Sequence, residues 1–401
     1  MTLEPWPEVP IGDFAREVTD QPIGDVEVLS VTKHRGFVPS LEYFGKQVFS
    51  KDISRYKLVS KGQFAYATIH LDEGSIDALE IREHGAISPM YTVFDVDGSR
   101  VDRRFLLELL RSNGMLRRYQ EIGQGTVNRR KSIAFATLAR ERIPLPPLAE
   151  QKKIAAILSS VDEAIRANDA VIEQTRRVKE GLLQELLTRG IGHTEFRETE
   201  IGPLPVGWEV HSLESACGAV IDYRGKSPPK SDSGVPLLTA KNIRTGYIDE
   251  EPREYIPEEE WETWMSRGLP REGDVMFTTE APLGKVAPHP GGRVAVAQRV
   301  MTFRGNERLL NRFLFWQLLA PPFQRRVQTN ATGSTALGIK GRTLRSMPIA
   351  VPPIDEQLQV SRKLDALHES ELAQRAATGR LSLLKSGLLQ DLLTGKVRVT
   401  P

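Results

Sequence analysis

Basic side chains gathered in three stretches are the residues of this chain with the clearest chemical use. The chain has 54 basic and 52 acidic residues and a formal net charge of +2, so the clustering, and not the total charge, is informative. Clustered basic side chains are typical of a surface that binds a polyanion, although a solvated surface is the alternative for any one cluster. An acidic segment at 249–262 increases the segregation. The basic stretches contain Lys33, Arg35, Lys46, Lys51, Arg55, Lys57 and Lys61; Arg224, Lys226, Lys230, Lys241 and Arg244; and Arg325, Arg326, Lys340, Arg342 and Arg345.

No group of residues forms a convincing catalytic pattern. The phosphate-binding pattern GxxxxGK[ST] does not occur. Glu150-Gln151-Lys152 ends as the motif of some metal-dependent nucleases does, but it stands at the predicted start of a helix, where the helix dipole favours an acidic residue. Glu280 has no second acidic residue beside it. We therefore predict no catalytic residues. The single cysteine, Cys217, and the scattered histidines predict no disulfide framework and no metal site.

Two motifs recur at one offset, which indicates an internal repeat. PPLAEQ at 146–151 returns as PPIDEQ at 352–357, and GLLQELLT at 181–188 returns as GLLQDLLT at 387–394. Both offsets are 206 residues (352 − 146 and 387 − 181). Between the two motifs, apolar residues alternate at steps of three and four, which is the seam pattern of paired helices. Each helix covers about 40 residues and is on the order of 60 Å long.

The variable regions before the helices are predicted to be mixed α/β domains, and each opens with a tryptophan, Trp6 and Trp208. Strands are expected at 26–32, 64–69, 91–96, 236–240, 275–279 and 294–302, and helices at 103–120 and 309–319. We predict a first recognition domain at 1–143, a first long helix at 144–190, a linker and second recognition domain at 191–349, and a second long helix at 350–401. Asn168 and Gln374 are equivalent polar positions midway along the helices, and we expect them to meet if the helices are antiparallel.

Composition sets the broad class of the protein. Hydrophobic residues make up 40% and charged residues 26% of the 401 residues, as is usual for a soluble globular protein. No apolar run is long enough to span a bilayer, and the N-terminus lacks the pattern of a secretory signal. A cytoplasmic location and no membrane partner are therefore expected.

Together these motifs resemble the specificity subunits of type I restriction–modification systems. The resemblance covers essentially the whole chain and rests on the doubled PPxxEQ, the long helices, the doubled LLxxLLT and LPVGWE at 204–209. Within the variable regions, it rests on sequences such as GFVPSLEYFGKQV at 36–48 and GDVMFTTEAPLGKVA at 273–287. The two regions look like different classes of target recognition domain.

The resemblance implies a non-catalytic protein that recognises DNA. Each recognition domain would read one half of a split, asymmetric site on double-stranded DNA. The long helices would form an antiparallel coiled coil that sets the gap between the half-sites. Two methyltransferase subunits and the motor–nuclease restriction subunits would dock on it. S-adenosylmethionine, ATP and Mg²⁺ would belong to those partners, and this chain would hold no cofactor of its own.

Residue types suited to base edges identify candidate readers of DNA. Asn242 suits adenine, and Arg244 or Arg299 suits guanine. The predicted readers are Lys33, His34, Arg35, Ser88 and Tyr91 in the first domain, and Arg224, Lys226, Lys230, Lys241, Asn242, Arg244, Gln298 and Arg299 in the second. Contacts to phosphates are expected from Lys51, Lys57, Arg129, Arg130, Lys131, Lys340 and Arg342.

Two other interpretations fit parts of the sequence. The helices could belong to an adaptor whose domains bind proteins, in which case DNA binding would lack the steep salt dependence of phosphate contacts. A self-contained nuclease with an unrecognised site would cut DNA alone in Mg²⁺, although the missing acid pair argues against it.

Overall fold

The computed structural model describes residues 4–24, 26–123, 132–333 and 336–399, which fall into two compact units. Unit 1 combines residues 1–168 with 377–401, and unit 2 is the continuous segment 169–376. The two long helices, α5 (Leu148–Leu186) and α11 (Ile354–Leu393), contribute to both units. Their lengths of 39 and 40 residues confirm the two predicted helices, whereas the predicted domain bounds stay a prediction.

Unit 1 contains two four-stranded sheets. The first has the antiparallel order β2-β9-β6-β7, and the second has the order β4-β3-β8-β5, in which β3 and β8 are parallel. The strands of the first sheet are β2 (Ala15–Val18), β9 (Tyr91–Val96), β6 (Phe64–Ala67) and β7 (Ile76–Ala78). Those of the second are β4 (Gly36–Pro39), β3 (Val28–Thr32), β8 (His84–Ile87) and β5 (Lys57–Ser60). A ribbon of β1 (Glu8–Pro10) and β10 (Arg142–Pro144) and the helices α1 (Ser40–Phe44), α2 (Arg103–Leu110), α3 (Asn113–Ile122) and α4 (Phe135–Leu138) complete the unit.

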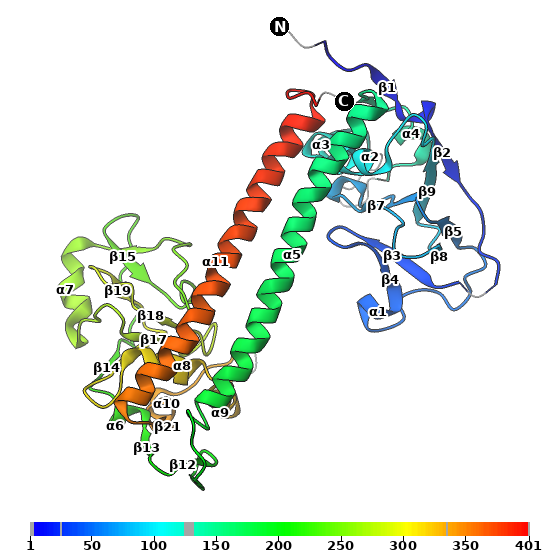
Figure 1. The fold of residues 1–401 in the computed structure, drawn as a ribbon. Helices are drawn as coiled ribbons and strands as arrows, with labels where there is room; N and C mark the ends of the chain where they lie inside the picture. Colours follow the sequence, from blue (N-terminus) through cyan, green and yellow to red (C-terminus); the bar gives the residue numbers. More distant parts are fainter. Residues whose placement is uncertain (1–3, 25, 124–131, 334–335, 400–401) are drawn as a thin grey trace. The chain divides into compact units, whose positions relative to one another are not determined.

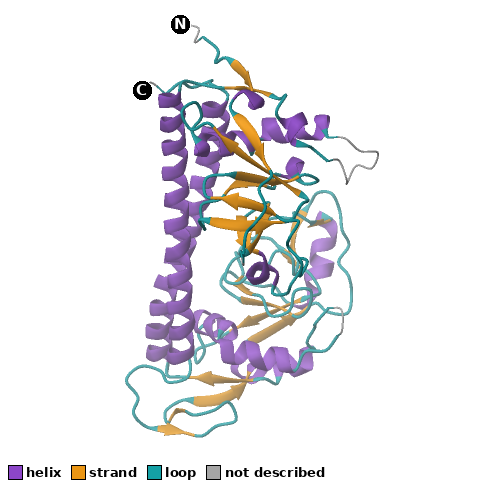
Figure 2. Ribbon diagram, turned by 90° about the vertical axis from the view of Figure 1, so that its right-hand side faces the viewer, coloured by secondary structure: helices purple, strands orange, loops and turns teal. Residues whose placement is uncertain are grey.

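Unit 2 repeats this plan with one strand fewer in its second sheet. The antiparallel order β14-β20-β17-β18 matches β2-β9-β6-β7, and β15 pairs with β19 in parallel as β3 does with β8. These strands are β14 (Ala219–Asp222), β20 (Val300–Arg304), β17 (Val275–Thr278), β18 (Val286–Pro288), β16 (Tyr255–Ile256), β15 (Val235–Leu238) and β19 (Ala295–Val296). Two ribbons, β11 (Phe196–Arg197) with β12 (Leu204–Pro205) and β13 (Glu209–Ser212) with β21 (Pro348–Val351), lie beside the ends of the long helices in this unit (Figure 2). The short helices are α6 (Leu213–Ala216), α7 (Trp261–Trp264), α8 (Asn311–Leu319), α9 (Pro321–Thr329) and α10 (Gly341–Arg345).

Two predicted elements are each divided in the structure. The single helix expected at 103–120 is the pair α2 and α3, because the Ser112 hydroxyl accepts a hydrogen bond from the Met115 amide (3.3 Å) and caps a new helix. The strand expected at 294–302 is β19 and β20, separated by a turn at 297–299 in which the Val300 amide donates to the Ala297 carbonyl (3.2 Å). Both divisions shorten a regular element where a polar or turn contact competes with it.

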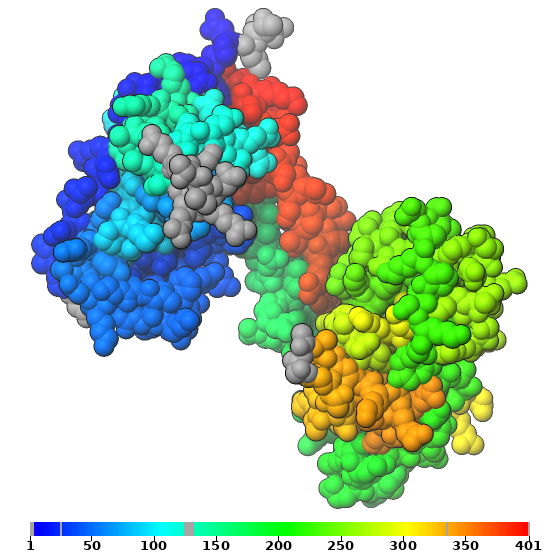
Figure 3. Space-filling view, turned by 180° about the vertical axis from the view of Figure 1, so that it is seen from behind, coloured from blue at the N-terminus to red at the C-terminus, as the bar shows by residue number. Residues whose placement is uncertain are grey.

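Each core takes the beginning of one long helix and the end of the other. In unit 1, Ile154 and Leu158 of α5 pack in one apolar cluster with Leu392 and Leu393 of α11. The equivalent residues of unit 2, which are Val360, Leu364, Leu186 and Leu187, also share a cluster. In the space-filling view, the red end of α11 lies against the blue and cyan parts of unit 1 (Figure 3). Burial of these apolar faces, at roughly 25 cal/mol per Å², is the main force that holds each unit together.

The glutamine of each PPxxEQ motif ties a long helix to its domain. The Gln151 amide accepts from the Asp102 amide (2.8 Å) and donates to the carbonyls of Arg100 (3.0 Å) and Pro146 (2.8 Å). Gln357 repeats the set with the Leu310 amide (2.9 Å) and the carbonyls of Arg308 and Pro352 (both 2.7 Å). Because Asp102 and Leu310 are the N-caps of α2 and α8, each glutamine joins the start of a long helix to the start of a domain helix.

The glutamate of each motif holds the tryptophan that opens a variable region. Glu150 accepts from Trp6 Nε1 (3.2 Å), from Arg398 (2.8 Å) and from the Val399 amide (3.0 Å). Glu356 accepts from Trp208 Nε1 and the Ile191 amide, both at 2.9 Å. Hydrogen bonding by Arg398 holds the pKa of Glu150 below its usual value. Glu150 thus connects the beginning and the end of the described chain, which is more than the dipole role expected from the sequence.

Polar contacts between α5 and α11 show that the helices are antiparallel within each unit (Figure 1). In unit 1, Asp162 accepts from Lys385 (2.9 Å) and Asn168 donates to Thr378 Oγ1 (3.0 Å). In unit 2, Lys179 binds Glu371. The later residues of α5 therefore meet the earlier residues of α11. Asn168 does bind a polar residue of the other helix, while its predicted pairing with Gln374 stays a prediction.

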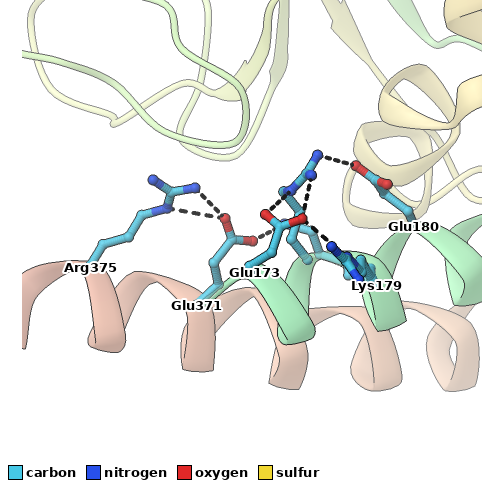
Figure 4. Close-up of polar contacts among 7 residues, drawn as sticks. Glu173, Lys179, Glu180, Glu371 and Arg375 are labelled. Atoms are coloured by element: carbon cyan, nitrogen blue, oxygen red, sulfur yellow. Dashed lines mark hydrogen bonds and ion pairs between the residues drawn. The ribbon is translucent and has the colours of Figure 1, made fainter. Parts of the chain in front are cut away.

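The Lys179–Glu371 ion pair is the centre of a charged network (Figure 4). The side chain of Glu371 is 8% exposed and also accepts from Arg375 (2.9 Å). Burial alone would raise the pKa of Glu371, but hydrogen bonds from Lys179 and Arg375 outweigh it and hold the pKa below its ordinary value of 4.5. The carboxylate is therefore ionised in the folded protein at neutral pH.

We expect Lys179→Met to lower the free energy of unfolding of unit 2 by about 2 kcal/mol at neutral pH, because a buried carboxylate loses a charged hydrogen-bond donor. A depressed folded pKa stabilises the protein above the unfolded pKa, and that stabilisation is lost as pH falls through the folded value. The difference from the wild type should therefore shrink below about pH 4. Urea unfolding between pH 3 and pH 7 measures it. Arg177→Met, at an exposed pair with Glu173, is the control and should change little. An effect of Lys179→Met that does not depend on pH would contradict the assignment.

Candidate nucleic-acid interface

The basic turn of the first domain lies between β3 and β4. Lys33, His34 and Arg35 form this turn and are all exposed. The Arg35 amide donates to Thr32 Oγ1 (3.0 Å), and the Arg35 guanidinium lies over the Tyr43 ring (5.7 Å to the centroid). The structure therefore presents these three predicted readers together on an ordered hairpin, where long polar side chains can reach a groove.

Ser88 and Tyr91 flank a second turn of the first domain. Ser88 is half-buried, and its carbonyl accepts from the Tyr91 amide (2.9 Å). Burial raises the pKa of the Tyr91 phenol, which hydrogen-bonds toward Ser30 and Val31 of β3. Lys57, a predicted phosphate contact, instead donates to the Tyr91 carbonyl (2.9 Å) and is only 19% exposed. That prediction is wrong for Lys57, because its ammonium group is used inside the domain.

An apolar corner beside the basic turn was missed by the sequence analysis. Leu41, Tyr43 and Phe44 of α1 are 56%, 43% and 44% exposed, and the two rings are in edge contact at 4.9 Å. A five-residue helix is too short to show an amphipathic period, so the sequence carried no signal for this surface.

Acidic side chains neutralise several predicted readers of the second domain. Lys230 pairs with Glu254, with Lys241 also near Glu254 (3.9 Å), and Arg244 pairs with Asp249 (2.9 Å). The acidic segment at 249–262 therefore supplies partners for the basic stretch before it. The charge segregation that was inferred from the sequence is reduced in space, because the chain folds these segments together.

Asn242 is a structural residue. Its side chain is buried at 2% exposure, and its oxygen accepts from the amide (3.0 Å) and hydroxyl (2.8 Å) of Thr239. Its amide group donates to the carbonyls of Asp249 and Pro252, both at 3.0 Å. All its hydrogen-bonding groups are used within the loop, so the prediction that Asn242 reads adenine is wrong.

A hollow of about 320 Å³ gathers three residues that the sequence analysis singled out for DNA contact. Arg224 follows β14, Gln298 lies in the turn before β20, and Lys340 precedes α10. Glu280, which follows β17, lines the hollow as well and pairs with Arg299 (3.0 Å). Five polar side chains from four separate segments thus meet at or beside one concave surface. Among the predicted readers of unit 2, this is the set that the fold brings together.

Two contacts fix Arg224 as one wall of the hollow. Its guanidinium donates to both carboxylate oxygens of Asp222 (2.8 and 2.5 Å), and Arg345 binds the same carboxylate (2.8 Å). Burial would raise the pKa of Asp222, but the two arginines hold it below its usual value. A side chain at Gly341 would begin 1.6 Å from Arg224 Nη2, so only glycine leaves room for the guanidinium.

The remaining predicted contacts are on the surface or outside the described part of the chain. Lys226, Lys51, Lys340 and Arg342 are exposed. Arg129, Arg130 and Lys131 lie outside the described residues. Sequence reasoning also missed Gly341, whose role depends on a guanidinium more than a hundred residues earlier in the chain.

Within the described ranges, no group of three or more histidine, cysteine, aspartate or glutamate residues is placed to hold a metal ion. The same part of the chain has no helix that is both long and apolar enough to cross a membrane.

Sequence comparisons relate the chain to one family. A family model described as the type I restriction modification DNA specificity domain matches residues 91–175 and 205–377, which is more than half of the chain. The putative type I restriction enzyme MjaX specificity subunit of Methanocaldococcus jannaschii is 28% identical over 94% of this chain and 87% of the relative. The MjaVIII specificity subunit of the same organism is 26% identical over 99% of this chain and 94% of the relative.

Solved structures share the fold. The type I restriction–modification S subunit from M. genitalium has a TM-score of 0.59 at 12% identity and covers 97% of this chain and 96% of its own. A chain of a structure described as "Structural basis underlying complex assembly and conformational transition of the type I R-M system" has a TM-score of 0.57 at 19% identity, covering 98% of this chain and 99% of its own. These likenesses confirm the predicted fold class of two mixed α/β domains and two long antiparallel helices.

Gly341→Ala is expected to displace the Arg224 guanidinium and to weaken binding of the cognate duplex about tenfold, because a base-edge arginine contributes about 1–3 kcal/mol. Fluorescence anisotropy with a labelled duplex measures the loss. Gly181→Ala is the matched control, since its added Cβ meets nothing within 4 Å and alanine favours a helix. Wild-type affinity in Gly341→Ala would mean that the hollow does not face DNA.

Proposed function

The chain belongs to the type I restriction–modification DNA specificity family, and from this premise we propose that it reads a bipartite, asymmetric DNA site with one domain per half-site. The observation that carries the proposal is the pair of PPxxEQ anchors. Gln151 and Gln357 attach two domains of the same strand order to two equivalent helices. A protein built in this way can hold two recognition surfaces at a set separation.

Unlike half-sites are proposed because the candidate surfaces differ in chemistry. The first domain offers the exposed turn Lys33–Arg35 beside an apolar corner. The second domain offers a polar hollow with Arg224, Glu280 and Gln298. Different arrangements of donors and acceptors favour different base sequences. The proposed target is therefore asymmetric even though the scaffold repeats.

We also propose that the long helices dock two methyltransferase subunits at equivalent places. Val178 of α5 and Leu384 of α11 occupy equivalent positions of the repeat and are 46% and 51% exposed. Exposed apolar residues on an otherwise polar helix face are favourable contacts for a partner. Methylation and cleavage would then reside in partner subunits, together with S-adenosylmethionine, ATP and Mg²⁺. The likeness to a chain from a type I assembly supports this arrangement.

Adenine methylation mapped by single-molecule sequencing tests the recognition role. Cells that express the chain with its methyltransferase subunit should show one split, asymmetric motif with a fixed gap. Deletion of the chain should abolish the motif, because the methyltransferase would lose its positioning on DNA. An assembled complex that methylates no such motif would contradict the proposal.

Glutamate substitutions at the two equivalent positions test docking. Val178→Glu and Leu384→Glu should each reduce the bound methyltransferase subunits from two to one, and the double variant should bind none, because an apolar contact is replaced by a charge. Mass photometry of the complexes measures the stoichiometry. Val206→Glu, at a 54% exposed linker position, is the control. Two subunits bound to the double variant would place docking elsewhere.

A further inference from the structure

We propose that Arg299 reads a guanine in the half-site of the second domain and that Glu280 is the positioning residue that orients it. This assignment rests on the proposed function and deepens it, because it names the base and the two side chains responsible. Sequence reasoning left Arg244 and Arg299 open as readers of guanine and gave Glu280 no role.

The backbone of Arg299 is held in place from both sides. Arg299 ends the turn at 297–299 that separates β19 from β20, and the next amide, of Val300, donates back to the Ala297 carbonyl (3.2 Å). The Arg299 carbonyl accepts from the amide (2.9 Å) and hydroxyl (3.2 Å) of Thr279, which is 2% exposed. The side chain therefore starts from a fixed point at the rim of the hollow, which lowers the entropy lost when it binds.

Glu280 leaves the outer end of the guanidinium available. Its carboxylate contacts Arg299 through Nε (3.0 Å), and both side chains are about half exposed, at 47% and 49%. Guanine presents O6 and N7 side by side in the major groove and takes two parallel donors from one arginine. With Nε held by Glu280, the terminal Nη1 and Nη2 groups are the pair that can make those two bonds. An exposed, neutral-in-sum pair of this kind adds little stability, so its geometry is the more informative feature.

The neighbouring residues favour Arg299 over the other arginines of unit 2. Arg224 is wedged between Asp222 and Gly341 and shares Asp222 with Arg345, so it serves as a wall. Arg244 is bound through Nε and Nη2 to Asp249 and is not among the residues that line the hollow. Arg299 sits next to Gln298, which lines the hollow and donates weakly to Ser227 (3.3 Å).

Glu280 is assigned to orientation because a lone carboxylate near DNA phosphates is repelled. Its charge is matched by Arg299, and Arg224 and Lys340 line the same hollow. A carboxylate can instead accept from the amino group of cytosine, which would make Glu280 a reader itself. The two roles predict changes at different base positions, and the experiment below separates them.

The test selects preferred duplexes from a randomised pool with the full chain bound to its methyltransferase subunits. Arg299→Lys keeps the charge but loses the paired donors, so preference for guanine at one position of one half-site should fall by roughly 5- to 150-fold. Arg293→Lys is the matched control, since the exposed Arg293–Glu258 pair lies in the same unit and is not part of the hollow. It should leave every position unchanged.

Glu280 variants and a modified base complete the design. Glu280→Gln and Glu280→Ala should weaken preference at the same guanine, and Glu280→Ala should add nothing at that position to Arg299→Ala. Replacing that guanine by 7-deazaguanine should weaken the wild type but not Arg299→Ala. Thermal melting confirms that each variant is folded.

Three results would overturn the assignment. A wild-type motif that Arg299→Lys leaves unchanged would remove Arg299 as the reader, while the proposed function would stand. A Glu280→Ala change at a different base would make Glu280 a reader in its own right. A wild-type complex that selects no motif would remove the proposed function and this assignment together.

Discussion

The buried glutamine at the start of each long helix is the contact on which the rest of the structure depends. Gln357 is fully buried and satisfies one amide and two carbonyls, and Gln151 does the same at the equivalent position. Leaving a buried backbone group unpaired costs about 1–3 kcal/mol, so each side chain prevents several such costs. Glutamate could accept but not donate at these sites, and alanine could do neither. A domain that varies in sequence can therefore be attached to a constant helix only where this side chain is kept.

The glutamate before it adds a second constraint. Glu150 and Glu356 bind the tryptophans that open the two variable regions, and each also binds the segment that follows the opposite long helix. Together, the two residues gather the beginning of a region, its end and the return of the chain from the other helix. The helices can then be similar while the sheets between the anchors change their loops. This division of labour explains how one scaffold carries a basic hairpin in one unit and a polar hollow in the other.

The sequence predicted the elements that follow a period or a repeat. The 206-residue offset identified both long helices, and β9 was placed to the residue. The pattern of apolar residues continued through Ser112, so the break between α2 and α3 was hidden by side chains that stay in phase. The hollow joins residues 224, 280, 298 and 340, and no local pattern can report that they meet. Asn242 was misjudged because residue type suggests chemistry but does not reveal burial, and Lys230 and Arg244 because their acidic partners become neighbours only on folding.

The composition of the two units has a consequence for how the chain folds as it leaves the ribosome. Unit 2 is one continuous segment, so its contacts can close once residue 376 has emerged. Unit 1 begins first but needs Leu392, Leu393 and Arg398 for its core and for the Glu150 anchor. Domains usually fold in the order in which they are synthesised. Here the order is reversed, so the first half of the chain waits, with its apolar helix face uncovered, until the last residues are made.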